Sequence, residues 1–101
     1  MECQVESQPG ETKVRITGRL SFEDYDRFFE IINEIKGNPG GRVILDLARL
    51  EFIDSAGLGM FLVARDVVAK IGLSLRIRQP NGLVAKVMTL VNYASEIPVD
   101  G

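Results

Sequence analysis

Hydrophobic and polar residues alternate in two short segments near the N-terminus. Residues 3–7 and 13–17 place valine and isoleucine on one side and charged or hydroxyl residues on the other. A period of two residues indicates half-buried strands. Pro9 and Gly10 lie between the segments and predict a turn, so the two strands should form an antiparallel hairpin. Gly18 is expected to end the second strand.

The next segment has a helical period. Ser21 is a good candidate for an N-cap, and acidic residues occupy the turn that follows it. Apolar residues then recur at three- and four-residue spacing, which predicts a helix with one face in the core. That face consists of Tyr25, Phe28, Phe29, Ile32 and Ile35. The glycine-rich residues 37–41 end the helix. They lack the Gly-Lys-Ser/Thr ending of a phosphate-binding loop and are interpreted as a linker.

Strands and helices alternate in the second half of the chain. Residues 42–47 form a short, almost continuously apolar run, as expected for a strand covered on both faces. Residues 57–71 and 83–91 have helical periods, residues 73–77 alternate, and residues 97–99 are expected to form a final edge strand. The prediction is an α/β domain with the order ββαβαβαβ. Its small mixed sheet has about four to five strands, an N-terminal hairpin followed by parallel βαβ units with helices packed on them.

The helix predicted over residues 57–71 has two apolar stripes. One consists of Leu58, Phe61, Leu62 and Val68, and the other of Met60, Val63 and Val67. The second stripe is either additional core or an exposed apolar patch that binds a partner or a second copy of the chain in a homodimer.

Composition and charge exclude several kinds of function. The length of 101 residues suits one domain, and the net charge of −2, with basic and acidic residues interspersed, argues against nucleic-acid binding. One cysteine and no histidine leave no internal disulfide and no cysteine or histidine metal cluster. No apolar run approaches the ~20 residues that span a bilayer, and the N-terminus does not resemble a signal peptide. We therefore expect a cytoplasmic chain that does not insert into membranes and holds no metal.

Ser55 lies between the apolar strand and the apolar helix, in the segment DLARLEFIDSAGLG. A catalytic serine needs a base, but the chain has no histidine and the sequence around Ser55 is not Gly-x-Ser-x-Gly. The acids Asp46, Glu51 and Asp54 lie in the same segment, yet nothing in the sequence brings three oxygen ligands together. Asp46 could instead accept hydrogen bonds from backbone amides. The chain is therefore not expected to be an enzyme.

Asp54 and Ser55 have two compatible interpretations. Both residue types are preferred N-caps, and a cap is worth ~1 kcal/mol. The Ser55 hydroxyl could also accept a phosphate, which would add about −1.5 to −2 charge at a helix N-terminus. The helix dipole and free amides there tolerate negative charge, so the phosphate would disturb a bound partner and not the fold.

Several segments resemble the STAS domain family, which includes the bacterial anti-sigma factor antagonists. Residues 46–59 resemble its central signature, and residues 18–20 resemble the Gly-x-Leu element before its first helix. Residues 72–75 and 81–90 also fit the family pattern. Because the similarity covers nearly the whole chain, it implies a single STAS domain with the STAS fold over residues 1–101.

The resemblance implies a partner-switching protein. In this family an unphosphorylated antagonist binds a serine kinase or anti-sigma factor and frees the factor that its partner restrains. Phosphorylation of the serine after the motif aspartate blocks binding, and a serine phosphatase of the PP2C type restores it. Asp54 matches the aspartate and Ser55 the phosphoacceptor. The kinase would hold the ATP, so no cofactor is expected in this chain.

The expected partner-binding surface surrounds Ser55. It consists of Ser21, Asp24, Asp54, Ser55, Ala56, Gly57, Leu58, Gly59, Met60 and Val63. The chain departs from the family at Ala56, where a second hydroxyl is common, and at Ser21, where aspartate is common. STAS-like domains also occur on transporter assemblies, so the alternative is a non-catalytic accessory subunit of an ABC-type membrane transporter.

Overall fold

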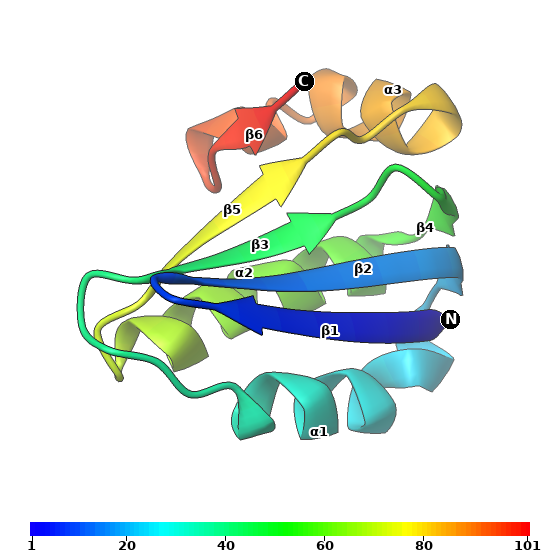
Figure 1. Ribbon diagram of the computed structural model, residues 1–101. Coiled ribbons are helices and arrows are strands. Elements are labelled where there is room, and N and C mark those ends of the chain that lie inside the picture. Colours follow the sequence, from blue (N-terminus) through cyan, green and yellow to red (C-terminus); the bar gives the residue numbers. More distant parts are fainter.

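The computed structural model describes all residues from 1 to 101 as a mixed β-sheet with helices on one face (Figure 1). The first two strands, β1 (Glu2–Gln8) and β2 (Glu11–Leu20), form the predicted antiparallel hairpin. Gly10 has a φ of +79° in the turn between them, which a residue without a Cβ adopts easily.

The elements after β2 include α1 (Tyr25–Glu34), β3 (Arg42–Asp46), α2 (Ser55–Ala69), β5 (Ser74–Arg78), α3 (Gly82–Leu90) and β6 (Val99–Asp100). Strands β3, β5 and β6 run parallel to β2, and each of them follows a helix. Strand order is β1-β2-β3-β5-β6, so each parallel connection steps in the same direction across the sheet. Connections of this kind with the usual right-handed sense place their helices on one face, and Figure 1 shows α2 behind the sheet.

One strand was missed by the sequence prediction. Residues Leu50–Ile53 form β4, which pairs in parallel with the end of β2. This pairing also extends β2 through Gly18 to Leu20, so the prediction that Gly18 ends the strand was wrong. Gly18 has a φ of +84° and lies where the register shifts, as expected for a glycine at a β-bulge. The sheet therefore has six strands, and β2 changes partner from β3 to β4 along its length.

A single apolar core lies between the sheet and the helices. Buried side chains from all three helices join those of β2, β3 and β5 in one cluster. Phe28, Phe29 and Ile32 of α1 are buried as predicted, whereas Tyr25 is 46% exposed because it begins the helix at the edge of the core. A short 3-10 turn, Phe22–Asp24, precedes α1, and another, Tyr93–Ser95, follows α3.

The two apolar stripes of α2 have different environments. Phe61 and Val68 of the first stripe are buried, and its other members are half-buried. The second stripe is divided: Met60 belongs to the core, Val67 is half-buried, and Val63 is 46% exposed. Neither alternative holds for the whole stripe, because at 100° per residue Val63 projects about 60° away from Met60, on the side away from the buried Ala64.

Candidate partner-binding site

The candidate site is the corner where β2 and β4 end and α2 begins. The amide of Asp54 donates a hydrogen bond to the carbonyl oxygen of Leu20 at 3.3 Å. This bond continues the β2–β4 ladder, in which Leu20 pairs with Ile53, by one residue. The residues on either side, Ser21 and Ser55, are thereby brought to the same corner although they are distant in the sequence.

Asp54 is the N-cap of α2. Its backbone is extended, and its Oδ1 accepts a hydrogen bond from the amide of Gly57 at 2.7 Å. The first amides of a helix have no partner within the helix, and this carboxylate satisfies one of them. The cap predicted from the sequence is confirmed, and it is made by Asp54, so the exposed side chain of Ser55 at the first helical position points to solvent.

Gly57 allows the corner to close. A Cβ at this position would lie 2.7 Å from Cγ1 of Ile53 and 3.1 Å from the carbonyl oxygen of Leu20. A Cβ added to Gly59, two positions later, would have no atom within 4 Å. The first glycine is therefore required by the close approach of α2 to the end of β2, and the second is not.

The β2–α1 connection forms the other side of the corner. The carboxylate of Asp24 accepts a hydrogen bond from the amide of Ser21 at 3.0 Å, within a capping box around the 3-10 turn. Phe22 lies between them with 72% of its side chain exposed. Phe22 could not be selected from the sequence, because a single aromatic residue beside a helix start gives no signal that separates an exposed side chain from a core one.

The first turn of α2 is also tied to the C-terminal segment. The hydroxyl of Tyr93 donates to the carbonyl oxygen of Leu58, and burial raises the pKa of this tyrosine well above its usual value. Two turns further along α2, the guanidinium of Arg65 donates to the backbone and side-chain oxygens of Glu96. These bonds hold the segment after α3 against the helix that carries Ser55.

The structure brings most of the predicted partner-binding residues together but does not expose all of them. Ser55 is exposed, and Val63 is exposed two turns further along α2. Gly57 and Met60 are buried and form the inner wall of the corner, so they could act on a partner only through the residues they support. The half-buried members are Ser21, Asp24, Asp54, Ala56, Leu58 and Gly59.

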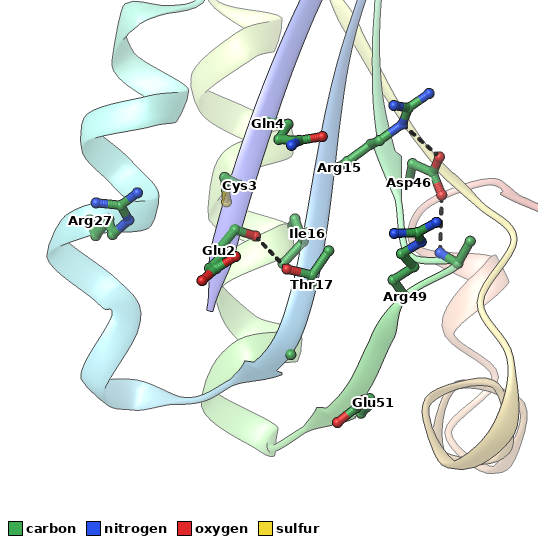
Figure 2. Close-up of a pocket in the computed structure, with 12 residues that line it drawn as sticks. Glu2, Cys3, Gln4, Arg15, Ile16, Thr17, Arg27, Asp46, Arg49 and Glu51 are labelled. Carbon is green, nitrogen blue, oxygen red and sulfur yellow. Dashed lines mark hydrogen bonds and ion pairs between the residues drawn. The ribbon is translucent and has the colours of Figure 1, made fainter.

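A hollow in the surface lies elsewhere, on the open face of the sheet (Figure 2). Arg15 crosses it and is 3.0 Å from Glu6 and 3.7 Å from Asp46. Oδ1 of Asp46 accepts a hydrogen bond from the amide of Ala48 at 3.0 Å, as the sequence suggested. Since these charges already pair with one another, and none of the predicted site residues lines the hollow, it is not the candidate site.

Two other features are absent from the structure, a metal-binding cluster and a membrane-spanning helix. No group of three or more acidic or cysteine side chains is placed to hold a metal ion. None of the helices has the length and apolar character that crossing a bilayer requires.

Comparison with known proteins assigns the family. The model of the STAS domain family matches residues 2–100. The chain belongs to the STAS domain family. No curated protein matches the sequence by sequence comparison.

Solved structures agree with the STAS fold. An anti-sigma factor antagonist from Mycobacterium paratuberculosis superposes with a TM-score of 0.82 at 16% identity, over 98% of this chain and 84% of that one. The anti-sigma factor antagonist SpoIIAA in its unphosphorylated form gives 0.71 at 22% identity over 99% and 89%. A structure of the Bacillus SpoIIAA in its phosphorylated form gives 0.62 at 20% identity over 99% and 92%.

A membrane protein also contains a similar domain. The murine anion transporter Slc26a9 superposes with a TM-score of 0.72 at 16% identity, over 95% of this chain but 17% of the transporter. At these identities the likeness extends to the fold alone.

Proposed function

We propose that this STAS domain is an anti-sigma factor antagonist whose binding to a serine kinase or anti-sigma factor is controlled by phosphorylation of Ser55. The observation that carries the proposal is the division of roles at the start of α2. Asp54 makes the structural cap, and its neighbour Ser55 presents a hydroxyl to solvent. Solved antagonists of the same fold, one of them in a phosphorylated form, support this assignment.

The domain can accept a phosphate on Ser55 without unfolding. Asp54 uses the amide of Gly57, and the amides of Ser55 and Ala56 belong to the first turn, where helices have no internal partner for them. A phosphate of about −1.5 to −2 charge is favourable beside such amides and the positive end of the helix dipole. The carboxylate of Asp54 opposes the phosphate, but its own charge is partly satisfied by the hydrogen bond from Gly57.

The same phosphate would weaken the binding of a partner. A side chain packed on this corner would have to displace water from a dianion next to the Asp54 carboxylate, and burying unpaired charge is costly. Phosphorylation therefore acts on the complex and leaves the free domain folded. Removal of the phosphate by a PP2C-type serine phosphatase would restore binding. In this role the chain acts in the cytoplasm as a binding protein and not as an enzyme.

The test uses the purified chain, ATP and the serine kinase encoded by the same organism. We expect the phosphate on Ser55 by mass spectrometry, and we expect Ser55→Ala to remain unmodified but bind the kinase like the wild type. Ser55→Asp should bind at least tenfold more weakly, although aspartate carries less charge than phosphoserine.

Ser7→Asp is the matched control for the added charge. Ser7 is exposed on β1, beside the turn of the hairpin and away from the corner. Ser7→Asp should leave the affinity for the kinase unchanged. Phosphate on another residue, or equal binding by Ser55→Asp and the wild type, would refute the proposal.

A second candidate function is an accessory subunit of a membrane transporter. The likeness of the fold to part of Slc26a9 favours it. In that case the chain would copurify with a transporter component, for example an ATPase of the ABC type, and Ser55→Asp would copurify equally well. Binding that depends on Ser55 distinguishes the antagonist from the subunit.

A further inference from the structure

Helix α3 exposes an apolar stripe that the domain does not cover. Leu90 is 84% exposed, and Leu83 and Val91 are 53% and 55% exposed. At 100° per residue these side chains project within about 100° of one another, while Val84 and Met88 of the same helix face the core. The apolar residues of α3 therefore do not all face the core. The α3 stripe consists of the exposed Leu83 and Leu90, the half-buried Val87 between them, and Val91 directly after the helix.

Both ends of α3 are fixed to the elements that form the Ser55 corner. Nδ2 of Asn81 donates to the carbonyl oxygen of Ala48 at 2.7 Å, in the turn that leads into β4. Tyr93, just beyond the other end, donates to Leu58 in the first turn of α2. Helix α3 packs against β4, and Figure 1 shows both at the same end of the sheet. These contacts fix the position of the α3 stripe relative to Ser55.

Helix α3 itself carries charge of one sign only. Residues 73–95 contain no aspartate or glutamate, although the chain has 14 of them. Lys86 is the one charged residue of α3; it is exposed and lies about 40° around the helix from Leu90. An apolar stripe flanked by a lysine is complementary to a partner surface of apolar residues with acidic neighbours.

We propose that the α3 stripe is the second part of the docking surface for the kinase that Ser55 controls, and that it binds an amphipathic helix of that kinase with an acidic residue opposite Lys86. The inference rests on the proposed function. The turn of residues 54–59 is too small alone, since a specific interface uses roughly 20–30 residues on each side. The spacing of the α3 stripe suits the i, i+3, i+4 contacts of a helix packed along it.

The test measures affinity for the purified kinase that modifies Ser55, by calorimetry. The double variant Leu83→Ser/Leu90→Ser removes apolar surface, and Lys86→Glu reverses the flanking charge. The matched controls are Ile71→Ser and Lys70→Glu, because these residues are exposed at the opposite end of α2.

We expect at least tenfold weaker binding for the double variant. Lys86→Glu should bind more weakly than the wild type, with a difference that shrinks as salt screens the charges. Both controls should stay within about twofold of the wild type, and every variant should keep the wild-type melting temperature, because the altered side chains are exposed.

Several results would overturn the inference. If Ser55→Asp loses binding while the stripe variants bind like the wild type, the proposed function stands and the α3 stripe does not belong to it. If the wild type does not bind the kinase, both fail together. A wild-type dimer in sedimentation that the double variant dissociates would assign the α3 stripe to a second copy of the chain. Binding of the wild type, but not the double variant, to phosphatidylcholine/phosphatidylglycerol vesicles would assign it to a lipid surface.

Discussion

Gly57 and Gly59 offer a matched pair of glycine-to-alanine substitutions in the first turns of α2. An alanine Cβ at position 57 would lie 2.7 Å from Cγ1 of Ile53 and 3.1 Å from the carbonyl oxygen of Leu20. Both distances are shorter than an ordinary van der Waals contact. The Leu20 carbonyl also accepts the hydrogen bond from Asp54, so it cannot move without weakening the corner. At position 59 the new methyl group meets nothing within 4 Å.

These contacts set the expected changes in stability. Overpacking of a fixed site costs about 1–3 kcal/mol, and alanine in a helix gains up to about 1 kcal/mol over glycine. Gly57→Ala should therefore lower the free energy of unfolding by about 1–2 kcal/mol. Gly59→Ala should raise it by up to about 1 kcal/mol.

Thermal and urea unfolding, followed by circular dichroism, measure the difference. In a domain of this size 1 kcal/mol shifts the melting temperature by roughly 4–8 °C. The two variants should thus differ by about 10 °C, with Gly57→Ala melting below the wild type and Gly59→Ala at or above it. Equal melting temperatures for the two variants would show that α2 does not approach β2 as closely as the structure has it.

Three other predictions concern the contacts around the corner and the sheet edge. Asp54→Ala should lower the free energy of unfolding by about 1 kcal/mol and Asp54→Asn by less, since asparagine also caps; equal losses in urea unfolding would contradict the capping role. Tyr93→Phe should cost about 1 kcal/mol near neutral pH through the lost bond to Leu58. Because burial raises the pKa of Tyr93 above its usual 10.0, this stabilisation is complete below that pH and is lost as the pH rises beyond it; a gap between wild type and variant that persists in alkaline unfolding would contradict this. The hydrogen bond from Arg76 lowers the pKa of Asp100, so their pairing contributes stability above the usual aspartate pKa and loses it as the pH falls through the lowered value; NMR titration should find that the Asp100 midpoint rises in Arg76→Gln, and an unchanged midpoint would refute the cause.

The order of strands and helices along the chain was largely predictable from the sequence, because the alternating and apolar segments are well separated by turns. Strand β4 was not, since its four residues lie between two stronger signals, the apolar β3 and the helix α2. Its existence depends on a long-range pairing with the end of β2, beyond the point where β3 leaves that strand. No local pattern reports such a pairing.

The candidate site was predictable in its chemistry and less so in its surface. The N-cap role of Asp54 follows from residue preference and is confirmed by its bond to Gly57. The exposure of Phe22 and Leu90 does not follow from the sequence, because periodicity identifies apolar faces but not what covers them. The division of α2 between a buried Met60 and an exposed Val63 has the same cause.

The assignment of Ser55 as a phosphorylation switch is tested most directly by one binding measurement on two forms of the same chain. The wild-type domain is phosphorylated by its kinase, the modified residue is mapped, and the affinity for the kinase or anti-sigma factor is compared with that of the unmodified domain. We predict phosphate on Ser55, at least tenfold weaker binding and a far-UV circular dichroism spectrum that does not change. Equal affinity of the two forms, or loss of binding that accompanies unfolding of the domain, would contradict the account.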